Sequence, residues 1–212
     1  NLSTAAGVML VGGGLAGNDN IALVTTTSGD VTVADAGAAG VKDVDTTGDL
    51  RLESTGGTVG DGGADLYIGT DNVVEIYAGQ NFVARSDIAT LQNGVLTGTA
   101  TFSLTEDDDL LITSLVTNNQ DATIDYTLPG LGGNFTVDSI DVGTGTLTMD
   151  SDGAILDNGD LAPADIIADT VDLTADTGIG GADPIEMQSV ILVVADSDTN
   201  NVQLSNAADA AV

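Results

Sequence analysis

Short triplets with an apolar, a polar and an apolar residue recur along the chain, each followed by a cluster of Gly, Asp, Asn, Thr or Ser. Alternation with a period of two over such short runs is typical of β-strands that bury one face. Triplet starts are separated by roughly 8 to 12 residues or about twice that, a spacing typical of all-β proteins. The triplets are residues 21–23, 31–33, 50–52, 66–68, 74–76, 102–104, 110–112, 124–126, 135–137, 147–149, 171–173 and 202–204.

Helical patterns are weak throughout the chain. No apolar stripe with a period of 3.6 residues extends over three helical turns. The best candidate covers residues 161–169, where Pro163 and the β-branched residues after it disfavour a helix. The sequence therefore predicts an all-β fold.

Two all-β architectures accommodate strands this short. A β-sandwich needs strands of about five or six residues, tight hairpins and a bulky core between its sheets. A parallel β-helix needs very short strands, inward rows of small aliphatic side chains, and Gly, Asn or Asp at its corners. Aromatic residues make up only 3% of the chain, and Gly-Asp precedes a triplet at Gly29 and again at Gly48. These features favour the β-helix, with the β-sandwich as the alternative.

The predicted β-helix is a single elongated segment over residues 1–212. With about 20 residues per coil and roughly 4.8 Å between coils, it would form a rod about 50 Å long. Residues 86–101 and 113–134 break the triplet spacing, so we expect loops or irregular coils around 86–134. The chain starts abruptly at Asn1, and we expect it to be a fragment or repeat of a larger protein.

The composition excludes several classes of function. Asp and Glu number 33 against three Lys and Arg, giving a net charge of −30, and both His and Cys are absent. This charge repels nucleic-acid phosphates and anionic membranes, but it attracts divalent cations. General acid–base catalysis usually draws on His, and Lys42, Arg51 and Arg85 are scattered along the sequence. We therefore expect neither an enzyme, nor nucleic-acid binding, nor insertion into a membrane.

Calcium is the cation that the acidic clusters favour. Four adjacent carboxylates at 106–109 repel one another unless a cation lies among them, and Ca²⁺ prefers hard oxygen ligands. A solvated loop is the alternative interpretation of this run. The spacing at 196–200 is that of a calcium loop, but it lacks the Glu that completes an EF-hand. The candidate Ca²⁺ ligands are Glu106, Asp107, Asp108, Asp109, Asp196 and Asp198. No cofactor is required.

Residues 165–206 carry a more specific pattern. A strand-like stretch is followed by Thr-Gly-Ile-Gly at 177–180, Asp-Pro-Ile-Glu at 183–186, an apolar run at 190–195, and Asn-Val-Gln-Leu-Ser-Asn at 201–206. This pattern resembles the repeats of filamentous-haemagglutinin-like giant exoproteins, over about a fifth of the chain. The resemblance implies a right-handed parallel β-helix in a long, secreted, cell-surface fibre or adhesin. The middle third of the chain departs from the repeat pattern.

These observations predict a structural or adhesive segment of a secreted, cell-surface or fibre-forming bacterial protein. Its expected partners are copies of itself, other components of a surface matrix, and divalent cations. The alternative is a calcium-dependent β-sandwich module that binds a glycan or another protein.

Overall fold

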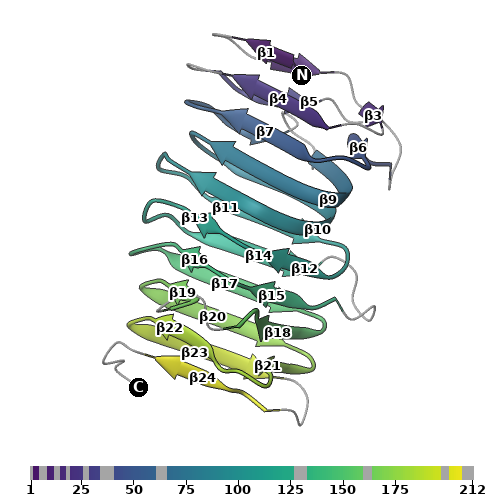
Figure 1. The fold of residues 1–212 in the computed structure, drawn as a ribbon. Coiled ribbons are helices and arrows are strands. Elements are labelled where there is room, and N and C mark those ends of the chain that lie inside the picture. Colours follow the sequence, from purple (N-terminus) through teal and green to yellow (C-terminus); the bar gives the residue numbers. More distant parts are fainter. Residues whose placement is uncertain are drawn as a thin grey trace.

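The protein forms one elongated β-solenoid, in which coil after coil stacks along a single axis (Figure 1). This computed structural model describes residues 2–4, 9–11, 15–17, 20–25, 29–33, 41–60, 66–126, 133–159, 164–196 and 201–206. All strand pairs are parallel and belong to one sheet. The predicted all-β fold and β-helix are confirmed. The β-sandwich alternative is wrong for the described residues, because sandwich sheets are antiparallel.

The strands lie in three rows, each running along the solenoid axis. The first row contains β1 (Leu2–Thr4), β4 (Ile21–Thr25), β7 (Leu50–Ser54), β9 (Leu66–Ala78), β10 (Phe82–Leu96), β13 (Leu115–Val116), β16 (Ile140–Asp141), β19 (Ile166–Ile167), β22 (Ile185–Gln188) and β24 (Leu204–Asn206). The second row contains β2 (Met9–Val11), β5 (Val31–Val33), β8 (Val59–Gly60), the start of β10, β11 (Phe102–Glu106), β14 (Ala122–Tyr126), β17 (Thr146–Ser151), β20 (Thr170–Ala175) and β23 (Ile191–Asp196). The third row contains β3 (Leu15–Gly17), β6 (Val44–Thr46), parts of β9 and β10, β12 (Leu110–Ile112), β15 (Phe135–Val137), β18 (Ala154–Asp157) and β21 (Gly178–Gly180).

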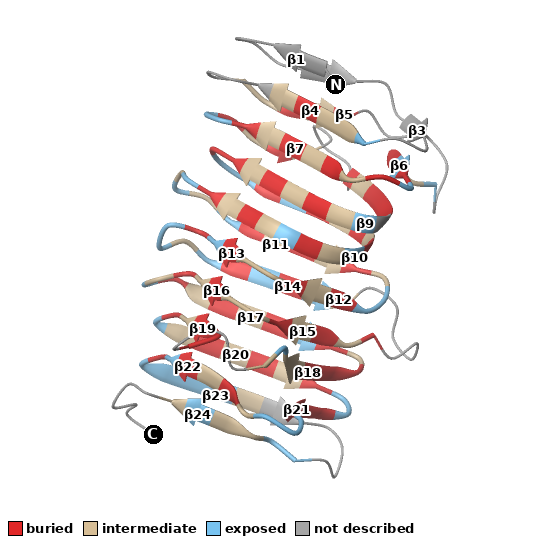
Figure 2. Ribbon diagram, in the orientation of Figure 1, coloured by how far each residue is buried: buried red, intermediate tan, exposed pale blue. Residues whose placement is uncertain are grey.

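The core is a continuous stack of inward side chains. Buried and partly exposed residues alternate along the strands, as they do in β11, and Figure 2 shows this banding along β9. Each inward residue packs on its equivalent in the next coil, because the parallel register places the two side by side. Phe82 stacks on Phe102 with ring centroids 4.8 Å apart. Other stacks are Leu23, Leu52 and Ile76, and Phe135, Ile155 and Ile179.

Coil length varies more than the triplet spacing indicates. Equivalent positions are 29 residues apart between Asn20 and Asp49, but only 18 apart between Glu75 and Asn93. The ladder continues through the described residues of 86–134, the region expected to be irregular. Within it, residues 86–96 were expected to form a loop but belong to β10. Two register shifts in β10, between Ile88 and Thr90 and between Leu91 and Asn93, absorb the mismatch with β9. The segment 127–132 lies outside the described residues.

Many acidic side chains at the corners of the solenoid form hydrogen bonds with the next coil. A carboxylate or amide oxygen accepts a hydrogen bond from the backbone N–H of a residue one coil further on, at 2.7–2.8 Å. Bonds to a charged acceptor stabilise by about 1.5–3 kcal/mol each. Much of the acidity therefore has a structural role. The pairs are Asp30–Thr58, Asp43–Tyr67, Asp109–Asn134, Asp121–Thr146, Asn134–Ala154 and Asp165–Glu186.

The structure differs from two local expectations. Within the segment 161–169, Ile166 and Ile167 form the strand β19, because β16 and β22 pair with them on either side. Residues 161–163 lie outside the described part. The triplet 202–204 is divided by a corner: Val202 bridges to Ile179, whereas Leu204 begins β24 and pairs with Ile185. Within the described residues no helix has the length and apolar character to cross a membrane.

Candidate functional site

The acidic run 106–109 lies at the corner between β11 and β12. The alternation of β11 directs Phe102, Leu104 and Glu106 to the inside of the solenoid. Glu106 is consequently fully buried, although it opens the most acidic stretch of the sequence. Asp108 and Asp109 follow in the turn and are exposed. The four side chains therefore occupy different environments and do not converge on one point.

Glu106 is held by two donors of the neighbouring coil and one of its own coil. The Ser86 hydroxyl donates to Oε2 at 2.5 Å, and the backbone N–H groups of Ile88 and Asp107 donate to Oε1 at 3.1 and 3.0 Å. Burial raises the pKa of Glu106 to about 8, against the effect of these three hydrogen bonds. At neutral pH this carboxyl group therefore holds its proton.

Asp107 belongs to an ion pair. Arg85 donates through Nε and Nη2 to its two carboxylate oxygens, both at 2.8 Å, and the Tyr67 hydroxyl donates to Oδ2 at 2.8 Å. The Arg85 guanidinium lies over the Tyr67 ring, 4.5 Å from its centroid. Burial and the hydrogen bond to Asp107 raise the pKa of the Tyr67 hydroxyl. Both carboxylate oxygens are thus occupied by protein donors.

The remaining predicted Ca²⁺ ligands are Asp109, Asp196 and Asp198. Asp109 accepts hydrogen bonds from the backbone N–H and the side-chain amide of Asn134, at 2.7 and 3.2 Å, and so serves as a corner bond. Asp196 ends β23, but the position of its side chain is outside what the structure describes. Asp198 lies outside the described residues altogether. Calcium binding at these positions stays a prediction.

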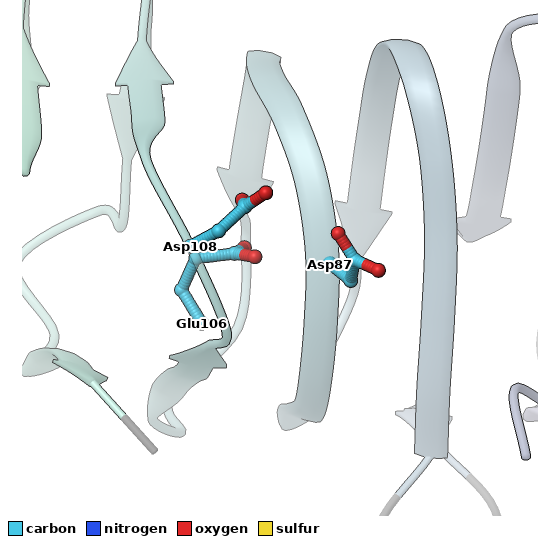
Figure 3. Close-up of side chains that lie close together, drawn as sticks. All are labelled: Asp87, Glu106 and Asp108. Atoms are coloured by element: carbon cyan, nitrogen blue, oxygen red, sulfur yellow. The ribbon is translucent and has the colours of Figure 1, made fainter. Parts of the chain in front are cut away.

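Glu106 and Asp108 instead meet Asp87, a residue of β10 on the preceding coil. One carboxylate oxygen from each of the three lies within 4.8 Å of the others, and Figure 3 shows the three side chains across adjacent coils. Lys42 Nζ lies 2.8 Å from Asp87 Oδ2 and 3.7 Å from Asp45 Oδ1. Partial burial and the charges of Asp87, Asp109 and Asp107 raise the pKa of Asp108, while Lys42 lowers it. We call Asp87, Glu106, Asp108 and Lys42 the first acidic cluster.

The first acidic cluster carries its own positive counterparts. The proton neutralises Glu106 itself, and the ammonium group of Lys42 offsets one of the two aspartate charges. Such a set can hold and release a proton near pH 8, and its oxygens are of the kind that a divalent cation prefers. Sequence reasoning missed Asp87, which is remote from the acidic run. The alternation of Phe102, Leu104 and Glu106 was, however, a signal that Glu106 points inward.

The other arginine forms a second ion-paired site on the outside of the solenoid. Arg51 donates to Glu53 at 2.6 Å and to Glu75 at 2.7 Å, and its guanidinium lies 4.4 Å from the centroid of the Tyr77 ring. A groove of about 410 Å³ beside it is lined by Asn20, Ile21, Ala22, Asp49, Leu50, Arg51, Val73, Glu75 and Gln92. Each of the three cationic residues of the chain is therefore bound to acidic groups.

A second acidic cluster was also missed. Asp157, Asp165 and Glu186 each offer an oxygen within 4.8 Å of the others. Asp157 and Asp165 are eight residues apart, and Glu186 follows 21 residues after Asp165, on the next coil. No contiguous motif joins the three, and the stacking of coils brings them together. Comparison of the chain with protein-family models, curated proteins and solved structures gives no match. The fold and these contacts are therefore the basis for inferring function.

Proposed function

We propose that this chain is a structural, non-catalytic segment of a secreted, cell-surface or fibre-forming bacterial protein. The observation that carries the proposal is the uninterrupted parallel ladder, which extends from β1 to β24 with one continuous core. Stacked coils contact mainly their neighbours, so the fold spans distance and is suited to a spacer or fibre. β-Solenoids are common in secreted adhesins and exoproteins.

The segment that resembles filamentous-haemagglutinin-like repeats supports this class of protein. Its strand-like stretch contains β20, its Thr-Gly-Ile-Gly sequence contains β21, its Asp-Pro-Ile-Glu sequence leads into β22, and its apolar run overlaps β23. The closing strand β24 ends at Asn206, as in the repeat pattern. The order of strands and turns is thus compatible with such a repeat.

The acidic groups support a role without catalysis. Glu106 is buried among hydrogen-bond donors, Asp107 is bound by Arg85, and several corner aspartates bond the next coil. A glycosidase would instead present two carboxylates across a cleft that binds the sugar. The high negative charge keeps an extended surface protein soluble and attracts divalent cations.

The C-terminal strands support contacts with further coils or copies of the chain. β23 pairs with β20 on one side, and no described strand pairs with its other edge. Its outward residues Ile191 and Val193 are each 49% exposed, where the aligned residues of β20 are Thr170 and Asp172. An open edge with apolar side chains favours addition of another strand.

Antibodies raised against the recombinant chain test the proposal on cells of the source organism. We expect immunogold labelling of intact cells, loss of the label after brief protease treatment, and detection of the antigen in the medium or in surface fibres. Labelling that appears only after the cells are permeabilised would contradict a surface location. An antibody against an intracellular protein controls for leakage.

A further inference from the structure

A site for a divalent cation, independent of the proposed function, is indicated where three carboxylates meet at a corner of the C-terminal coils. Asp157 ends β18, Asp165 directly precedes β19, and Glu186 lies in β22 on the next coil. The parallel register of β19 and β22 aligns Asp165 with Glu186: Asp165 N–H donates to the Glu186 carbonyl, and Glu186 N–H donates to Asp165 Oδ2, both at 2.8 Å. We call Asp157, Asp165 and Glu186 the second acidic cluster.

The spacing of the oxygens fits one ion. One oxygen of each carboxylate lies within 4.8 Å of the other two. Oxygens that bind Ca²⁺ lie at about 2.3–2.6 Å from the ion, so two ligands of the same ion are at most about 5 Å apart. A single Ca²⁺ can therefore contact all three carboxylates with little movement of their side chains.

An unpaired oxygen at this cluster points independently to a missing ligand. Asp157 Oδ1 accepts a hydrogen bond from the Gly159 N–H at 2.9 Å. Its other oxygen, Oδ2, has an exposed area below 1 Å² and accepts no hydrogen bond within the described part of the chain. Asp165 beside it is only 1% exposed. Buried polar atoms in native proteins almost always have a partner, so a buried carboxylate oxygen without one indicates a bound group.

The chain has no cationic side chain to supply that partner. Lys42 reaches the first acidic cluster, whereas the sequence after Arg85 contains no Lys, Arg or His. At the second acidic cluster, only backbone N–H groups, a proton or an external cation can therefore offset the negative charge. Burial and the neighbouring Glu186 and Asp157 raise the pKa of Asp165 to about 7, so that the proton is lost above neutral pH.

We propose that Asp157, Asp165 and Glu186 bind one divalent cation of the hard, oxygen-preferring type, with Ca²⁺ as the ion that fits best. Oxygen ligands exclude a preference for soft thiolate-binding metals. Mg²⁺ gives up its water reluctantly, which disfavours it beside a carboxylate as buried as Asp165. The ion joins two consecutive coils, because Glu186 lies one coil beyond the other two ligands.

Calcium titration of the metal-free recombinant chain tests the site. The protein is treated with EDTA, dialysed into 150 mM NaCl at about pH 8, above the pKa of Asp165, and titrated calorimetrically with CaCl₂. We expect one tight site in the wild type, weakened about tenfold or more in Asp157→Asn. Asp125→Asn, at an exposed position of β14 outside both acidic clusters, is the matched control, because it makes the same change in net charge, and it should bind like the wild type.

The outcomes separate a built site from the general attraction of an acidic surface. Equal affinity and stoichiometry in Asp157→Asn and Asp125→Asn would overturn the proposal, since binding would then follow net charge alone. Crystals of the wild-type protein soaked in MnCl₂ give a second readout that needs no variant. An anomalous peak among Asp157, Asp165 and Glu186 supports the site, and its absence there refutes it.

Discussion

The coils formed by residues 41–126 and by residues 133–206 have the same backbone architecture, but their acidic groups have different partners. In the first region Lys42, Arg51 and Arg85 form ion pairs with nearby carboxylates, and the two arginines lie over tyrosine rings. The second region contains no cationic side chain. Its second acidic cluster has a buried oxygen that accepts no hydrogen bond from the residues that the structure describes.

This difference shows that stacking by itself does not require charge balance within the chain. Both regions keep the same parallel ladder and the same inward apolar rows. Three cationic side chains offset part of the negative charge in the first region, whereas in the second only protons, backbone N–H groups of the corners or external cations can do so. The two regions should therefore respond alike to changes in the core and differently to changes in charge or pH.

The largest effect is expected from the core, and it should be the same in both regions. Leu104 in β11 and Leu173 in β20 are both fully buried. Leu104→Ala and Leu173→Ala should each lower the free energy of unfolding by about 2–5 kcal/mol, through lost contacts and an incompletely filled cavity. Urea denaturation followed by circular dichroism measures the change. Two separate unfolding transitions would instead show that the regions unfold independently.

The dependence of stability on pH should differ between the regions. Burial raises the pKa of Glu106 in the first region from 4.5 to about 8. The folded protein therefore binds this proton more tightly than the unfolded chain does. The resulting stabilisation is complete below pH 4.5 and is lost at about 1.4 kcal/mol per pH unit as the pH rises to about 8.

Glu106→Gln replaces the protonated carboxyl group by a neutral group of the same shape and should remove this loss. The variant should be more stable than the wild type at about pH 9, and its stability should fall less steeply between about pH 5 and pH 9. Urea midpoints measured at each pH test this expectation. Asp165→Asn should likewise remove a loss of stability with rising pH in the second region. That loss ends at about pH 7, the raised pKa of Asp165. Parallel pH profiles for wild type and Glu106→Gln would refute the assignment of the proton to Glu106.

The smallest effect concerns the ion pairs of the first region. Arg85→Met keeps an apolar stem but leaves Asp107, whose side chain is 10% exposed, without its cation. We expect a loss of about 2 kcal/mol in the free energy of unfolding. Arg51→Met is the matched control, since the Arg51 side chain is 39% exposed, and it should cost at most about 1 kcal/mol.

Urea unfolding at low and high NaCl, together with the double variant Arg85→Met/Asp107→Asn, measures the contribution of the pair. The double variant should recover part of the lost stability, because the unpaired charge is gone. If Arg85→Met cost no more than Arg51→Met, burial of Asp107 would not set the strength of the pair.

Particular residues show how far the sequence could predict the site. The run 106–109 was identified as chemically special, and the structure places Glu106 and Asp108 in an acidic cluster. Asp107 and Asp109 were grouped with them because they are adjacent in sequence, yet the corner directs them to Arg85 and Asn134. Asp87 and the second acidic cluster could not be predicted, because contacts between coils depend on coil length.

The sequence by itself determined the all-β fold and the inward and outward faces of most strands. Alternation with a period of two is a local property, and the rule holds in each coil regardless of the others. Only the tertiary structure decided which carboxylates meet. Equivalent positions on successive coils are 17 to 29 residues apart, and the shifts in β10 change the register locally. The partners of a corner residue therefore follow from stacking rather than from spacing along the chain.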